Sequence, residues 1–248
     1  AQVRVTERGP VRATVEVSRQ FLNSRLTQRY HLYAGLRRVD IENELDWHES
    51  GGKDKDAPML RATFKPQLGR GTATFEVPFA GLERTADGNE VPALRWADVS
   101  DGEYGLSLLN NAKYGHQIHG VTLGLTLVRA PYEPDNLPDQ GLQTFTYSLY
   151  PHAGDWRQAS TDRRAAELNQ PLLVAVEGNH PGSIPANQAM LTCEPAGVMV
   201  TAVKVAESDP NALIVRLVEM HGQATQANLR WAWPVERVEE VNILEEHL

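Results

Sequence analysis

The sequence predicts an all-β protein, and two observations support this fold class. Apolar and polar residues alternate in many short segments, beginning with every second residue from Val11 to Val17. Because successive side chains of a strand point to opposite faces, this period gives each strand one apolar and one polar face. Dipeptides typical of turns separate such segments at Asp87-Gly88, Asp101-Gly102 and Tyr114-Gly115. Many short strands divided by turns in this way are typical of a β-sandwich.

Further segments have the same period, and we expect a strand in each of them. They are residues 26–33, 38–47, 59–64, 72–77, 104–109, 121–128 and 142–150. Later in the chain, apolar stretches predict strands that begin near Met190, Val198, Leu213, Ala224 and Val235.

One segment departs from this alternation. Residues 160–168 begin with two hydroxyl side chains, continue with acidic residues and alanines, and are followed by Pro171. Capping hydroxyls and a proline that prevents continuation predict one short helix. Residues 177–185 are rich in Gly and Pro, which marks an exposed link. We therefore expect one domain over residues 1–180 and a second over 181–248, either a small sandwich or strands that complete the first.

Composition narrows the range of functions. The net charge is −8 and the basic residues are scattered, whereas a nucleic-acid surface needs them clustered. No apolar run approaches the roughly 18 residues of a membrane span. The single cysteine, Cys193, is compatible with a reducing cytoplasm, where we expect the protein to reside. Because the chain opens with Ala1, without an initiator Met or a signal sequence, we expect both ends to be cut from a longer chain.

The residues by themselves show no catalytic or metal-binding set. The usual signatures of zinc proteases, nucleotide-binding loops and serine hydrolases are absent from the sequence. The nearest metal-like spacing is that of His116 and His119. On a strand, residues three apart point to opposite faces, so exposed or hydrogen-bonded histidines are favoured over metal ligands.

Five short motifs follow one another between residues 94 and 152. They are Arg95-Trp96-Ala97-Asp98, Lys113-Tyr114-Gly115, Arg129-Ala130-Pro131, Asp139-Gln140-Gly141 and Phe145-Thr146-Tyr147-Ser148-Leu149-Tyr150-Pro151-His152. This order resembles the C-terminal β-domain of glycoside hydrolase family 38 α-mannosidases. Similarity extends to residues 38–47, 59–64, 168–172, 203–207 and 215–219. The resemblance implies a large mutarotase-like β-supersandwich, one short linking helix and a smaller β-sandwich.

The same resemblance implies that this chain is a non-catalytic framework of a zinc-dependent, retaining α-mannosidase. In the family, the zinc ligands, the Asp nucleophile and the Asp acid/base lie in an N-terminal α/β domain and a helical bundle. We therefore expect no catalytic residue, no cofactor and no metal site in these residues, and no activity of the chain alone. The expected partners are those N-terminal domains and a mannose-containing oligosaccharide, and a homo-oligomer is left open.

Five residues are candidates for contact with the sugar. Asp139 and Gln140 lie in a loop that resembles one near the active-site mouth of family members, some of which carry a basic residue near Gln140. That loop can instead be a simple turn, closed by Asp139 and a positive φ at Gly141. Lys113 and Tyr114 offer an ammonium and a ring that suit sugars, or they pack across neighbouring strands. His152, at a strand end, faces either the catalytic domain or solvent.

Other residues have mainly structural interpretations. We expect Trp96 in the core, and Arg95 with Asp98 as a buried ion pair. Trp231 and Trp233 share one face, which favours a sandwich core over a sugar-stacking pair. Two alternative functions stay open. One is a stand-alone mutarotase or sugar epimerase, in which His116 or His152 would act with a nearby Glu, and the other is a carbohydrate-binding module.

Overall fold

The computed structural model describes residues 1–54 and 56–248. It divides the chain into two compact units, Ala1–Pro171 and Leu172–Leu248. The regular secondary structure of both units consists mainly of strands, and the described residues contain one short helix, α1 (Thr161–Asn169), where the sequence predicts one. The all-β prediction is therefore confirmed. The domain boundary at residue 180 stays a prediction, and that residue lies in an extended segment without helix or strand.

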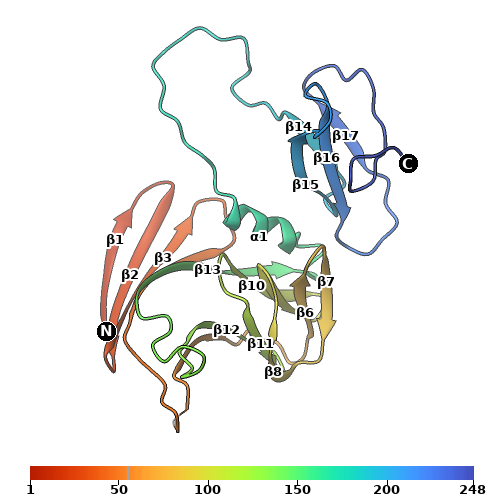
Figure 1. The fold of residues 1–248 in the computed structure, drawn as a ribbon. Coiled ribbons are helices and arrows are strands. Elements are labelled where there is room, and N and C mark those ends of the chain that lie inside the picture. Colours follow the sequence, from red (N-terminus) through yellow and green to blue (C-terminus); the bar gives the residue numbers. More distant parts are fainter. Residues whose placement is uncertain (55) are drawn as a thin grey trace. The chain divides into compact units, whose positions relative to one another are not determined.

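The first unit is a sandwich of two antiparallel sheets (Figure 1). The large sheet has nine strands in the spatial order β1 (Gln2–Arg8), β2 (Arg12–Phe21), β3 (Ser24–Tyr33), β4 (Val39–Trp47), β13 (Gly141–Ala153), β10 (Tyr104–Asn110), β9 (Trp96–Ser100), β6 (Thr72–Val77) and β7 (Ala80–Arg84). The small sheet has four strands in the order β5 (Met59–Phe64), β12 (Thr122–Arg129), β11 (Gly115–His119) and β8 (Asp87–Pro92).

The main core lies between these two sheets. In β4, alternate apolar residues such as Ile41 and Leu45 are buried, while Glu42 and Glu44 between them are exposed. The small sheet contributes Leu123 and Leu125 from β12 to the same cluster. In β4, the period-2 pattern in the sequence therefore marks the face that is buried.

The centre of the large sheet is covered on both faces. A second apolar cluster of Trp96, Leu109, Trp156 and Ala165 packs α1 against the face opposite the small sheet, and the rings of Trp96 and Trp156 have centroids 4.9 Å apart. Figure 1 shows α1 on one side of β13 and β10, with β11 and β12 on the other. All five residues of β9 are consequently buried. The prediction that Trp96 belongs to a core is confirmed.

The predicted ion pair between Arg95 and Asp98 is wrong. Arg95 instead pairs with Glu76 on β6, with 3.0 Å between Nε and Oε1. Arg95 and Asp98 lie three positions apart, so their side chains point to opposite faces of the sheet. The carboxylate of Asp98 accepts hydrogen bonds at Oδ2 from Ser107 Oγ and from His152 Nε2, each at 2.7 Å.

The turns match the sequence only in part. At Asp101-Gly102 the prediction is confirmed, since Asp101 Oδ1 accepts from the backbone N–H of Tyr104 and Gly102 has a φ of +96°. Asp87-Gly88 instead begins β8. Tyr114-Gly115 leads into β11, and the chain reverses earlier, where Asn110 Oδ1 accepts from Lys113 N at 2.8 Å. An Asx side chain that closes a turn with its own backbone explains that displacement.

The second unit contains two two-stranded sheets. They pair β14 (Leu191–Glu194) with β17 (Asn228–Trp231), and β15 (Val198–Val205) with β16 (Leu213–Glu219). The strands predicted near Ala224 and Val235 are wrong. A turn held by the Glu219 carboxylate delays the last strand until Asn228, and Pro234, which has no N–H to donate, follows its end.

The aromatic pair of the second unit, Trp231 and Trp233, does not form a buried core. Trp231 and Trp233 have ring centroids 5.4 Å apart, but Trp233 is 37% exposed. It lies beyond the end of β17, so the alternation that places Trp231 on the sheet does not extend to it. The prediction that both rings fill a sandwich core is therefore wrong for Trp233.

Substitution of Gly105 tests how tightly the centre of the large sheet is packed. A Cβ at Gly105 would lie 2.3 Å from Cε1 of His152, so we expect Gly105→Ala to lower the free energy of unfolding by about 1–3 kcal/mol. A Cβ at Gly69 meets nothing within 4 Å, so Gly69→Ala should change the free energy of unfolding by less than about 0.5 kcal/mol. Urea unfolding followed by tryptophan fluorescence measures both variants. Equal stability of the two would contradict this packing.

Candidate functional site

Three loops that cross between the large and small sheets form the candidate site. They join β4 to β5 (loop 48–58, described over residues 48–54 and 56–58), β10 to β11 (residues 111–114) and β12 to β13 (residues 130–140). We call this part of the first unit the crossover end. It contains four of the five residues that the sequence predicts to contact a sugar.

Strand register brings two of these loops together. Trp47, which precedes loop 48–58, pairs with Gly141, which follows loop 130–140. At the other ends of the same loops, Met59 pairs with Arg129. The loops also approach closely between their ends, since a Cβ on Gly51 would lie 2.8 Å from the carbonyl oxygen of Ala130. Glycine at this position therefore permits the contact.

Loop 130–140 ends in a rigid turn. Asp139 has a φ of +59° and Gly141 a φ of +95°, and the side-chain amide of Gln143 donates to the carbonyl oxygen of Asp139 at 2.6 Å. The Asx-type bond expected at Asp139 occurs instead at Asp135, whose Oδ1 accepts from Leu137 N at 3.0 Å. The side chain of Asp139 is thus not used to close the turn.

Gln140 is held in place by a residue that sequence reasoning missed. Its Nε2 donates to the backbone carbonyl of Glu49 at 2.7 Å. The buried carboxylate of Glu49 accepts from Asn23 N at 2.9 Å and from Ser24 Oγ at 2.7 Å, which ties loop 48–58 to the turn between β2 and β3. The sequence offered one weak signal for this role, an acidic residue soon after a predicted strand.

Lys113 and Tyr114 extend the crossover end from loop 111–114. The ammonium of Lys113 lies 4.3 Å from the ring centroid of Phe145, a cation–π contact. Burial lowers the pKa of Lys113, and the nearby carboxylate of Asp139 opposes this shift. The ring of Tyr114 is 63% exposed and available for stacking. The charge of Asp139 therefore acts on Lys113, although 26 positions separate the two residues in the sequence.

His152 lies elsewhere. It belongs to the opposite end of β13 from Gly141, where it is buried against Asp98. It does not join the other four candidates. Contact of any of the five with a sugar stays a prediction.

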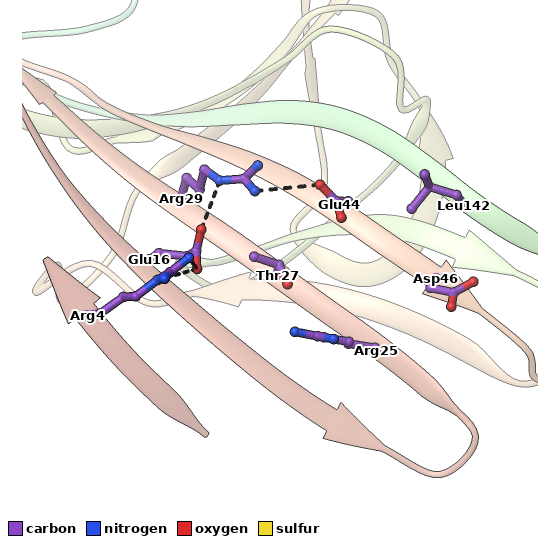
Figure 2. A pocket seen from close by; sticks show the side chains of 8 residues that line it. All are labelled: Arg4, Glu16, Arg25, Thr27, Arg29, Glu44, Asp46 and Leu142. Carbon is purple, nitrogen blue, oxygen red and sulfur yellow. Dashed lines mark hydrogen bonds and ion pairs between the residues drawn. The ribbon is translucent and has the colours of Figure 1, made fainter. Parts of the chain in front are cut away.

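A shallow hollow lies on the outer face of the large sheet, next to this end (Figure 2). Its volume is about 410 Å³, and its lining residues are Arg4, Glu16, Arg25, Thr27, Arg29, Glu44, Asp46 and Leu142. Burial raises the pKa of Glu16, but its hydrogen bonds to Arg4 and Arg29 outweigh that effect and hold the pKa below the usual value. The three arginines balance the three carboxylates, so the hollow favours no ion of either sign.

The two histidines with metal-like spacing do not converge. His116 is fully buried, and its Nε2 lies 3.2 Å from Nδ2 of Asn110, whereas His119 is exposed. Over residues 1–54 and 56–248, no group of three or more His, Cys, Asp or Glu side chains is arranged to hold a metal ion. The epimerase alternative requires either His116 or His152, and both are buried and closed to a sugar from solvent.

Burial of His116 predicts a pH dependence of stability. Burial lowers its pKa from 6.5 to about 4, partly opposed by backbone hydrogen bonds with Leu94 and Lys113. Between these values the unfolded chain binds a proton that the folded protein does not, so the free energy of unfolding falls as the pH is lowered. The expected loss is about 3 kcal/mol. Urea unfolding from pH 7 to 4 measures it. His116→Gln should flatten this fall and His119→Gln should not, and identical profiles for the two variants would refute the assignment.

The effect of Asp139 on the charge of Lys113 can be measured directly. We expect the pKa of Lys113 to lie below its ordinary value of 10.5 and to fall further in Asp139→Asn, because the carboxylate that stabilises the ammonium is lost. An NMR titration of the lysine side-chain signals provides the measurement. Asp135→Asn, in the same loop, is the control and should leave the pKa of Lys113 unchanged. A pKa of Lys113 that is insensitive to Asp139→Asn would contradict this electrostatic interaction.

Comparison with protein families gives two matches. A model described as "Glycosyl hydrolases family 38 C-terminal domain" matches residues 1–137, and one described as "Glycosyl hydrolases family 38 C-terminal beta sandwich domain" matches residues 197–248. Among curated relatives, human "Alpha-mannosidase 2C1" is 36% identical over 90% of this chain, and "Alpha-mannosidase G" of Dictyostelium discoideum is 30% identical over 98%. The chain spans only 22% and 23% of these two relatives.

Solved structures share the fold. A family 38 protein from Enterococcus faecalis superposes on 100% of this chain with a TM-score of 0.81 and 19% identity, and this chain covers 34% of it. An α-mannosidase from Enterococcus faecalis V583 gives a TM-score of 0.80. The predicted fold, a large supersandwich followed by a smaller sandwich, is thereby confirmed. Among the described residues, no helix is long and apolar enough to cross a membrane. Since the first family model covers more than half of the 248 residues, this chain belongs to glycosyl hydrolase family 38, as part of its C-terminal region.

Proposed function

We propose that this chain is the non-catalytic C-terminal framework of a zinc-dependent, retaining α-mannosidase. One observation carries the proposal: the chain matches both C-terminal family models, yet spans only about a fifth of relatives that are named α-mannosidases. The catalytic carboxyl groups of such an enzyme would then belong to the rest of a longer polypeptide. The proposed substrate is a mannose-containing oligosaccharide, and the proposed location is the cytoplasm.

The donor groups of this chain do not suit a zinc site. Within the part that the structure describes, no three His, Cys, Asp or Glu side chains are arranged so that they could bind one metal ion. We therefore assign the zinc, like the nucleophile and the acid/base, to the N-terminal domains. There a metal ion would polarise sugar oxygens while two carboxyl groups perform the retaining displacement. This chain takes no chemical step in the proposal.

The crossover end is the part of this chain that we propose to face the sugar. Tyr114 offers an exposed ring for stacking, and Lys113 and Asp139 offer a donor and an acceptor for hydroxyl groups. Gln140 is held by Glu49 rather than free to move. A rigid polar rim of this kind would orient a neutral oligosaccharide without requiring a net charge.

The proposal predicts activity only in a longer protein. The reading frame that contains these residues should extend upstream by several hundred codons, and its product should hydrolyse 4-nitrophenyl α-mannoside. We expect a chelator to abolish this activity and zinc to restore it, and NMR to show the α-anomer of mannose as the first product. The 248-residue chain alone should be inactive.

Three results would overturn this function. They are a stop codon directly upstream, a longer product that does not cleave mannosides, and acceleration of glucose or galactose mutarotation by the chain alone. The last result, measured by polarimetry, would favour the epimerase alternative. Calorimetric titration of the chain with mannosides tests the carbohydrate-binding alternative, which predicts heat of binding without the rest of the polypeptide.

A further inference from the structure

A run of five apolar residues immediately after the first unit is almost completely exposed. Leu172 is 94% exposed, Leu173 97%, Val174 87% and Val176 94%, and Ala175 between them is exposed as well. Scattered exposed apolar residues are common on protein surfaces, but a continuous run is not. The run lies between Pro171 and Glu177, so its apolar character begins and ends abruptly.

The backbone of this run also lacks partners. Residues 172–176 belong to no helix or strand. Among the described residues, none of their N–H or C=O groups takes part in a hydrogen bond. The two valines favour extended structure, and apolar residues on both faces are typical of a strand that is covered on both sides. At five residues the run is far shorter than the roughly 20 of a membrane span.

The segment that leads into the run is fixed in the first unit. Asn169, the last residue of α1, donates from Nδ2 to the carbonyl oxygen of Asn110 at 3.0 Å. Asn110 ends β10 and immediately precedes loop 111–114. The end of α1 therefore lies beside the loop that carries Lys113 and Tyr114, and the run begins three positions later in the chain.

We propose that residues 172–176 form a β-strand that docks onto the part of the longer α-mannosidase polypeptide outside these 248 residues. This inference rests on the proposed function. The length of the human relative supports this partner for the strand, because about four fifths of that relative has no counterpart in this chain. The partner surface must offer an apolar groove and an unpaired strand edge, since the run needs both side-chain burial and backbone hydrogen bonds.

Hydrogen exchange measured by mass spectrometry tests the docking without any substitution. In the 248-residue chain, the amides of residues 172–176 should exchange at the rate of an unstructured peptide. In the product of the full reading frame, we expect exchange to slow at least roughly a hundredfold. Unprotected amides in the longer protein would overturn the inference. Protection in the short chain that rises with its concentration would also overturn it, because the occupant would then be a second copy.

A pair of matched variants provides a second test. Val174→Asp places a charge in the run, and Ile184→Asp makes the same type of change at another exposed apolar residue of the same extended segment. In the longer protein, we expect Val174→Asp to lower Tm by roughly 5 °C or more and Ile184→Asp to leave it unchanged. In the 248-residue chain, neither should alter Tm. Equal effects of both variants in the longer protein would contradict a docked strand.

The two proposals can fail separately. A longer protein that cleaves mannosides while residues 172–176 stay unprotected would refute the docking and leave the function intact. A longer protein in which the run is protected but mannosides are not cleaved would refute the function and retain the docking.

Discussion

The buried carboxylate of Asp98 is the interaction on which the first unit depends. It joins β9 to β10 through Ser107 and to β13 through His152, and Ser107 in turn lies 2.8 Å from the hydroxyl of Thr161 at the start of α1. Both partners bind Oδ2, whereas Oδ1 is buried without a hydrogen-bond partner among the described residues. Removing Ser107 or His152 would leave this buried carboxylate still less compensated, which costs far more than the net worth of the bond. The network therefore ties β9, β10, β13 and α1 together.

Burial of the sheet centre on both faces also determines where function can lie. With the small sheet on one face of β9 and β10 and α1 on the other, no open surface remains at the centre of the large sheet. The candidate sugar-facing groups lie instead where the chain crosses between sheets. There the side chain of Gln140 joins two loops through the carbonyl oxygen of Glu49, and the charge of Asp139 acts on Lys113 of a third loop. In the proposed function, this end would support a catalytic centre in another part of the same polypeptide.

The apolar run 172–176 is a second exposed feature, because its side chains and its backbone meet no partner among the described residues. The proposed function gives this exposure a physical reason. A region that packs against other domains of the same polypeptide carries surfaces that are buried only when those domains are present.

The sequence alone determined the all-β class, strands such as β2, β3 and β4 and the helix at Thr161–Asn169, because alternation and a following Pro171 are local properties of a few neighbouring residues. The capping expected of the first hydroxyl does not occur, since Ser160 has a φ of +53° and its side chain makes no cap hydrogen bond. Alternation failed at β9, which is buried on both faces. Only the tertiary structure decided that Asp98 pairs with His152 rather than Arg95, and that Glu49 holds Gln140. Those partners lie far apart along the chain, and strand register, which depends on the whole core, brings them together.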